Sequence, residues 1–310
     1  MVRLAALALV LVLAGCGSTT AISAPPGVPS APSRSGDCRT VTIAVNPWVG
    51  YRANVAVVRY LLERELGCTV IERELTEQAS WEGIADGTVD VILENWGHDD
   101  LKKKYIDDTR AAVELGLTGN KGVIGWYVPP WLATAYPGVT NWRNLNKYVG
   151  LFQGVLLDGD PSFVTNDAAL VRNLKLNLTV EYAGSEDKLI AAFRAAEANR
   201  TPLIGYFYEP QWLLSEIDLV HVPLPRYTPG CDADPKTVAC DYQPYDLDKI
   251  ARREFADPGS PAAALIKNFT WTNADQNAVA RDLTVTGLPP DQAAKRWLDA
   301  HRTVWQSWLI

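Results

Sequence analysis

The chain has 310 residues, a formal net charge of −7, five cysteines, eleven tryptophans and twelve tyrosines. The acidic balance argues against a broad nucleic-acid-binding surface, and the length is sufficient for two lobes. Most of the aromatic side chains are expected in the core, although chains this rich in aromatic residues often use some of them for recognition.

The first residues have the pattern of a secretory signal. Arg3 is followed by an apolar stretch, residues 4–14, that is too short to span a bilayer. The sequence LAGC at its end resembles a bacterial lipobox, which implies cleavage before Cys16 and a lipid on its sulfur; the alternative is a generic signal with an incidental cysteine. We expect a lipoprotein signal peptide over residues 1–15 and, over residues 16–36, the lipidated cysteine and a flexible tether rich in Ser, Thr, Ala, Pro and Gly. No later segment is apolar enough over about eighteen residues to span a membrane.

Strands and helices alternate along the mature chain. In chain order, the pattern predicts a strand over 41–45, a helix over 52–66, a strand over 69–75, a short helix opened by Ser80, a strand ending at Trp96, an extended segment over 121–131, a strand near 155–157, helices over 166–174 and 185–198, and a strand over 202–208. The last third is predicted to be mostly helical, with one helix capped by Thr272 or Asn273 and another opened by two prolines. This alternation predicts an α/β protein with parallel sheets.

The cysteines other than Cys16 form two candidate disulfides in a compartment that permits them. Cys231 and Cys240 flank a polar loop that has no core of its own. Cys38 and Cys68 each precede a predicted strand, and their side chains are within reach if those strands are parallel neighbours. No Cys-x-x-Cys motif indicates a metal or redox site.

Aromatic residues recur where predicted strands end. Trp48 and Trp96 each follow a strand, and Tyr208 ends another. Ligands of α/β proteins bind beyond the carboxyl ends of strands, and the segment DGDPSFVTND brings backbone amides to the same region. For any single ring, capping of the core is the simpler explanation, but the repetition favours an aromatic box. Such a box suits a methylated ammonium, and each ring contributes about 0.5–2 kcal/mol to its binding.

These residues carry a resemblance to a known family, the glycine betaine/choline/proline-betaine class of substrate-binding proteins of ABC importers. The matching stretches are VNPWVGY, GTVDVILENW, GVIGWYVP, GDPSF, PLIGYFYEPQW and AAKRW. The resemblance covers nearly all of the mature chain. It implies a two-lobed, periplasmic-binding-protein-like α/β fold with a hinge and a ligand cleft between the lobes. By position, Trp48, Trp96 and Tyr208 match the rings around the quaternary ammonium, and the backbone near Val164 and Thr165 matches the carboxylate-binding turn.

The resemblance also implies how the protein works. It indicates an extracytoplasmic binding protein, anchored to the membrane by its N-terminal lipid, that is not an enzyme and uses no cofactor or metal. The expected partners are a small quaternary ammonium ligand and an ABC permease with its ATPase subunit, and we expect the protein to act as a monomer.

The sequence departs from the family pattern around the expected site. Tyr208 stands where the family has Trp, and Gln211 stands where it has His. Glu94 and Glu209 add negative charge near the expected site. Apart from helix amides, only Arg52 could be a basic partner for a ligand carboxylate. Acidic and amide groups would suit the hydroxyl and positive charge of choline better than the carboxylate of a betaine. The further candidate ligand-binding residues are Glu94, Glu209, Phe163, Asn166 and Arg52.

The chain is predicted to pass between the two lobes twice. We predict lobe one over residues 37–124 and 223–310 and lobe two over residues 125–222. The two crossing segments, near 125–128 and 220–225, form the predicted hinge.

Two other functions are open at this point. A lipid-anchored extracellular carbohydrate-active enzyme or sugar-binding protein could stack sugars on the same rings, with Glu94 and Glu209 as candidate carboxylates. A metal-dependent hydrolase could use His98–Asp100, but no two histidines share a ligand spacing. The sequence contains neither a Gly-x-Ser-x-Gly elbow nor a Gly-rich phosphate loop.

Overall fold

The computed structural model describes residues 38, 40–256 and 259–309. The expected signal peptide, Cys16 and the tether lie outside the described residues. Among the residues that are described, no helix combines the length and apolar character needed to cross a membrane.

The described strands form one mixed sheet with two regions. The strands are β1 (Thr40–Val45), β2 (Thr69–Glu74), β3 (Val91–Asn95), β4 (Ala112–Val128), β5 (Val155–Asp158), β6 (Thr179–Tyr182), β7 (Gly205–Glu209), β8 (Val220–Val222) and β9 (Tyr245–Arg252). Their order is β2-β1-β3-β9-β4-β7-β5-β6, and β8 pairs with β4. We call the part built on β1, β2, β3 and β9 lobe one and the part built on β5, β6, β7 and β8 lobe two.

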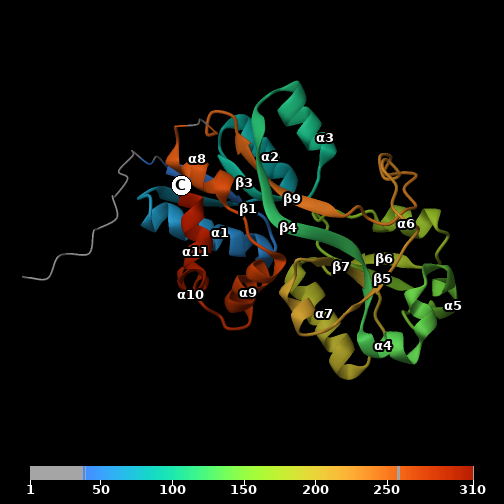
Figure 1. Cartoon of the computed structure of the whole chain (residues 1–310). Helices are drawn as coiled ribbons and strands as arrows, with labels where there is room; N and C mark the ends of the chain where they lie inside the picture. The colour runs from blue at the N-terminus through green and yellow to red at the C-terminus, as the bar shows by residue number, and fades with distance from the viewer. Residues whose placement is uncertain (1–37, 39, 257–258, 310) are drawn as a thin grey trace, which may run out of the picture. The chain divides into compact units, whose positions relative to one another are not determined.

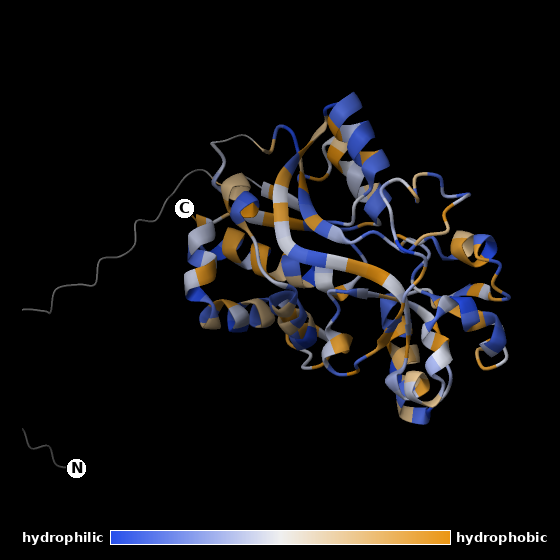
Figure 2. Cartoon of the chain, turned by 45° about the vertical axis from the view of Figure 1, so that its right-hand side comes forward, coloured by the Kyte–Doolittle hydropathy of each residue, from blue (hydrophilic) through white to orange (hydrophobic). Residues whose placement is uncertain are grey.

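Strand β4 belongs to both regions. Its first part pairs with β9 and its last part, from Val123 to Tyr127, pairs with β7, so it passes from one lobe into the other (Figure 1). Figure 2 shows a hydrophilic middle stretch of β4 between two hydrophobic ones. The predicted parallel pairing holds for β1 with β2 and β3, and for β5 with β6 and β7. The strands around β4 and β9 are antiparallel, so the sheet is mixed rather than parallel.

Helices and short helical turns connect and cover the strands. The α-helices are α1 (Val49–Arg64), α2 (Glu77–Asp86), α3 (Asp99–Lys102), α4 (Pro130–Ala135), α5 (Leu145–Tyr148), α6 (Asp167–Asn173), α7 (Glu186–Asn199), α8 (Pro261–Asn268), α9 (Asn273–Thr284), α10 (Pro290–Ala300) and α11 (Arg302–Trp305). The turns are the π turn η1 (Lys103–Asp108) and the 3₁₀ turns η2 (Pro137–Thr140), η3 (Trp142–Asn144), η4 (Trp212–Ser215) and η5 (Gln306–Leu309).

Two helix caps differ in how well the sequence predicted them. Thr272 caps α9 in a capping box with Asp275, and it is one of the two predicted candidates. Helix α2 begins earlier than predicted, because the hydroxyl of Thr76 accepts the Ala79 N–H. Ser80, the predicted cap, is a buried residue inside that helix.

Strand β9 contradicts the prediction that the last third of the chain is mostly helical. Its sequence YDLDKIAR alternates charged and apolar residues and was not recognised as buried. Asp248 finds donors in Lys102 and Asn95, and the fully buried Lys249 donates to the main-chain carbonyls of Lys267 and Phe269. Because each charge has a partner, the strand can lie in the middle of the sheet.

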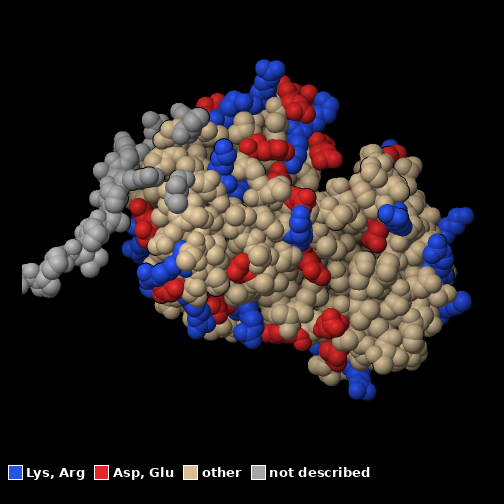
Figure 3. Space-filling model, in the orientation of Figure 1, with Lys and Arg blue, Asp and Glu red and all other residues tan. Residues whose placement is uncertain are grey.

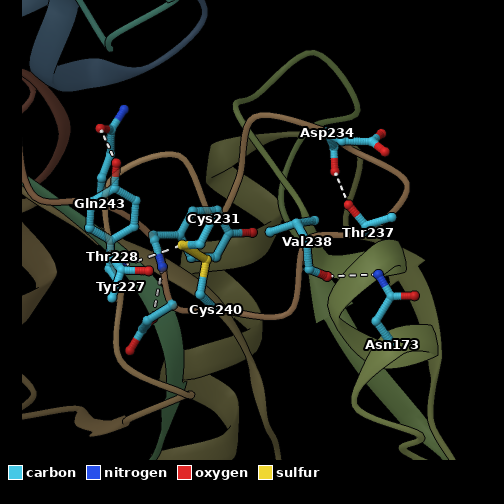
Figure 4. Close-up of a disulfide and its surroundings, with 11 residues drawn as sticks. Asn173, Tyr227, Thr228, Cys231, Asp234, Thr237, Val238, Cys240 and Gln243 are labelled. Carbon is cyan, nitrogen blue, oxygen red and sulfur yellow. Dashed lines mark hydrogen bonds between the residues drawn. A yellow bond between two sulfur atoms is a disulfide. The ribbon is translucent and has the colours of Figure 1, made fainter.

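The chain between β8 and β9 lies along lobe two before it returns. The side-chain amide of Asn173 donates to the carbonyls of Lys236 and Val238, at 3.0 and 2.7 Å (Figure 4). The Tyr242 hydroxyl donates to the carboxylate of Asp167 at 2.6 Å. These contacts bring Lys236, Val238 and Tyr242 against α6, and the assignment of residues 223–310 to lobe one stays a prediction.

The structure contains two disulfides. Cys38 is joined to Cys68 beside the parallel pairing of β1 with β2. Cys231 is joined to Cys240 in the loop that lies over α6 (Figure 4). The surface charges of both signs are interspersed, and the face in Figure 3 has no continuous basic patch.

Candidate functional site

A small pocket collects residues from both lobes. It measures about 260 Å³, including its opening to solvent, and five of its eight lining residues are aromatic. The lining residues are Trp48, Glu77, Trp96, Ile124, Phe163, Val164, Tyr206 and Tyr208. The structure thus brings the three strand-end rings of the sequence prediction together.

The rings of the pocket meet edge to face. The ring centroids of Trp48 and Phe163 are 5.8 Å apart at 88°, and those of Trp96 and Tyr208 are also 5.8 Å apart at 88°. Phe163 and Tyr208 are 6.1 Å apart at 83° and connect the two pairs. Perpendicular rings turn faces as well as edges toward a common space, and a ring face attracts a cation.

Two glycines leave the space that two of these rings occupy. A Cβ atom at Gly122 on β4 would lie 2.7 Å from the ring of Trp96. A Cβ atom at Gly159 would lie 2.8 Å from the ring of Phe163. Any side chain at either position would therefore push a ring out of place.

Glu94 anchors the two tryptophans from behind. Its Oε1 accepts the indole N–H groups of Trp48 and Trp96, both at 2.8 Å. Its Oε2 accepts the side-chain amides of Asn54 and Gln276, at 2.5 and 2.9 Å. Burial raises the pKa of Glu94 to about 7. The sequence suggested that Glu94 contacts the ligand, but it is not among the lining residues and instead fixes the orientation of two that are.

Glu186 is a second buried carboxylate, and it links the two lobes. Its Oε1 accepts the Tyr208 hydroxyl and the Gln211 amide, at 2.5 and 2.9 Å. Its Oε2 accepts the backbone N–H of Val49, in the first turn of α1, at 2.7 Å. Trp48, at the N-cap of α1, provides no side-chain cap, so the cap comes from the other lobe. Burial also raises the pKa of Glu186.

The loop between β5 and α6 contributes Phe163 and Val164 to the pocket. Val164 lines the pocket, whereas the Thr165 hydroxyl donates to Asp158 at 2.8 Å. The Asn166 N–H donates to the Tyr242 hydroxyl at 2.8 Å and is not free. The backbone N–H groups of Val164 and Thr165 have no hydrogen-bond partner among the described residues.

Two charged candidates lie elsewhere. Arg52 pairs with Glu74 at 2.8 Å, its side chain is 48% exposed, and it borders a different cleft. Glu209 is exposed and does not line the pocket. No Lys or Arg is among the residues that line the aromatic pocket.

Sequence reasoning missed three lining residues. Tyr206 shares the inward face of β7 with Tyr208, and its i, i+2 spacing could have identified it. Ile124 pairs with Tyr208 across β4 and β7. Glu77 begins α2 rather than following a strand, so no strand-end pattern identified it.

The fold and pocket together define a two-lobed substrate-binding protein. The family model "Substrate binding domain of ABC-type glycine betaine transport system" matches residues 39–300. The chain therefore belongs to this family. Because the family consists of substrate-binding proteins, the chain is a binding protein and not an enzyme, and the carbohydrate-active alternative has no support.

Individual relatives agree with this assignment. A trimethylamine N-oxide-binding protein of Pelagibacter ubique (strain HTCC1062) is 25% identical over 285 residues, which cover 86% of this chain and 90% of that protein. Lactococcal OpuAC with glycine betaine has a TM-score of 0.70 at 20% identity, covering 88% of this chain and 100% of that one. An ABC-transporter choline binding protein with choline has a TM-score of 0.72 at 17% identity, covering 87% and 91%.

Proposed function

We propose that the pocket captures a small methylated ammonium compound, a quaternary ammonium or trimethylamine oxide, for delivery to an ABC permease and its ATPase. The observation that carries the proposal is the gathering of five aromatic side chains from both lobes around one small pocket. Each ring face contributes about 0.5–2 kcal/mol to the binding of a cation that has lost its water. Several such contributions suffice for micromolar binding, about −8 kcal/mol.

Three of the rings in the pocket have their polar groups bound elsewhere, which favours a ligand that packs its methyl groups against ring faces. The indole N–H groups of Trp48 and Trp96 point to Glu94, and the Tyr208 hydroxyl points to Glu186, so the rings offer mainly their π surfaces. The free N–H groups of Val164 and Thr165 are the proposed donors to a ligand oxygen. Relatives whose names mention trimethylamine N-oxide, glycine betaine and choline fit this chemistry.

Opening and closing of the lobes is the proposed route for the ligand. Strand β4 is one crossing between the lobes, and the contacts of residues 223–242 with α6 support placing the other just after Tyr242. A ligand that touches rings of both lobes stabilises the closed form because those contacts are complete only there.

The N-terminus is proposed to hold the protein at the outer face of the cell membrane. The lipobox-like sequence supports lipid on Cys16, followed by a tether that leaves the folded part free as a monomer. Metabolic labelling with a fatty acid tests the anchor: label is expected in the wild type and not in Cys16→Ser, and equal label in both would contradict it.

A ligand panel tests the proposed function. Thermal unfolding is measured with choline, glycine betaine, proline betaine, carnitine and trimethylamine oxide, and at least one should raise the melting temperature because it binds only the folded state. Trp48→Ala and Trp96→Ala should each lower affinity for that ligand about ten- to a hundredfold. Trp142→Ala, a partly buried tryptophan that does not line the pocket, is the matched control. A shift with simple sugars and none with the panel would overturn the proposal.

A further inference from the structure

One carboxylate lines the aromatic pocket itself. Glu77 is the first residue of α2, is only 6% exposed, and is the single charged residue among those lining the pocket. Glu94 and Glu186 differ from it in two ways. Both oxygens of their carboxylates accept hydrogen bonds, and neither residue lines the pocket.

The carboxylate of Glu77 has one ionisable neighbour, His98, and its Oε1 accepts no well-aligned hydrogen bond from the described residues. Its Oε1 lies 3.1 Å from Nε2 of His98. Neither of these two atoms has a well-aligned hydrogen-bond partner among the described residues, although both are fully buried. Buried carboxylate oxygens normally have such partners, because burial without them is costly.

The place of Glu77 in its helix does not account for its burial. A carboxylate in the first turn interacts favourably with the helix dipole, but this requires no burial. The hydroxyl of Thr76 already caps α2. The side chain instead lies in the wall of a pocket that is lined mainly by aromatic rings. A negative charge at this place would stabilise a bound cation.

We propose that Glu77 is the counter-charge of the bound cation and that it selects ligands with a net positive charge over zwitterionic or neutral ones. The inference rests on the proposed function and deepens it. Choline carries a net charge of about +1, whereas glycine betaine and trimethylamine oxide carry about zero at neutral pH, so the carboxylate attracts choline as a whole and repels the betaine carboxylate. No lysine or arginine lines the pocket, and His98, whose pKa is raised by Glu77 against the opposing effect of burial, is the basic side chain beside the carboxylate.

The test compares affinities of the full chain for three probes. Choline, glycine betaine and trimethylamine oxide are titrated calorimetrically into the wild type and Glu77→Gln, which keeps the shape and removes the charge. Choline affinity should fall at least tenfold, while affinity for the two uncharged probes should change less than threefold or rise. Glu82→Gln, an exposed position on the same helix, makes the same charge change outside the pocket and should alter none of the three.

The outcomes separate the role of Glu77 from the proposed function. Equal changes for all three probes in Glu77→Gln would overturn the assignment of Glu77 and leave the proposed function standing. Absence of binding by any probe to the wild type would overturn the proposed function and the assignment with it. If Glu77→Gln unfolds, Glu77→Asp keeps the charge and should retain the preference for choline, whereas loss of that preference in a folded Glu77→Asp would contradict a role of the charge.

Discussion

The two halves of the pocket are held in different ways. In lobe one, Trp48 and Trp96 share the carboxylate of Glu94, and the other donors to that carboxylate also come from lobe one. In lobe two, Tyr208 is held by Glu186, but Glu186 also bonds across to the start of α1 in lobe one. The tryptophan pair is therefore organised within its own lobe, whereas the anchor of Tyr208 depends on contact between the lobes.

This difference suggests an order of events. We expect a cation to meet the preorganised tryptophan pair first and Phe163 and Tyr208 only as the lobes close. The hydrogen bond from the Val49 N–H to Glu186 joins the two lobes, so it can form only when they are closed. We therefore expect it to lengthen the lifetime of the closed form and to leave the rate of ligand association unchanged.

The largest expected effect comes from removing the anchor of lobe one. Glu94→Ala would leave four buried donors without their acceptor, each costing about 1–3 kcal/mol if no water replaces it. We expect a fall of at least a hundredfold in ligand affinity by calorimetry and a loss of about 4 kcal/mol or more in unfolding free energy by urea denaturation.

Glu94→Gln is the matched control for that change. The side-chain oxygens of Asn54 and Gln276 have no partners among the described residues, so either amide can rotate to accept the new NH₂ group. We expect less than tenfold loss of affinity. If Gln is as damaging as Ala, the negative charge rather than the hydrogen bonds holds the pair.

The same variant should change how stability depends on pH. Burial raises the pKa of Glu94 to about 7, from about 4.3 in an unfolded chain. Between these values the folded protein binds more protons than the unfolded chain, so its stability should fall as pH rises. The contribution is about 4 kcal/mol in total. Urea denaturation at pH 5 and pH 7 should show a smaller fall in Glu94→Gln, and an unchanged fall would show that Glu94 is not its source.

The sequence predicted the positions of the rings better than their supports. Trp48, Trp96 and Tyr208 could be found because parallel strands end at one edge of a sheet, and each follows or ends such a strand. Glu186 begins a helix far away in sequence, and its contact with the Val49 N–H joins residues 137 positions apart, which no local pattern records. Strand β9 was missed because its charges are paired by residues distant in the chain, and no local pattern records that pairing.

A smaller effect is expected from cutting the bond between the lobes. Glu186→Ala removes the acceptor of the Val49 N–H, a lost cap that costs about 0.5–2 kcal/mol, and it also removes the acceptor of the Tyr208 hydroxyl and the Gln211 amide. Stopped-flow measurements should show about tenfold faster ligand release and little change in association, because the bond forms after capture. Asp187→Ala, at the exposed neighbouring position, is the control. A slower association with unchanged release would reverse the proposed order.

The smallest effect is expected at the hydroxyl of Tyr208. Tyr208→Phe keeps the ring face and removes only the donor to Glu186, whose Oε1 still accepts the Gln211 amide. We therefore expect a two- to threefold loss of affinity, about 0.5 kcal/mol, because the hydroxyl points at the anchor and not at the ligand. Tyr208→Ala, which removes the ring, should cost about ten- to a hundredfold in calorimetric titrations. If Phe is as damaging as Ala, the ring face contributes little, and lobe two acts on the ligand through Glu186 and not through the aromatic surface of Tyr208.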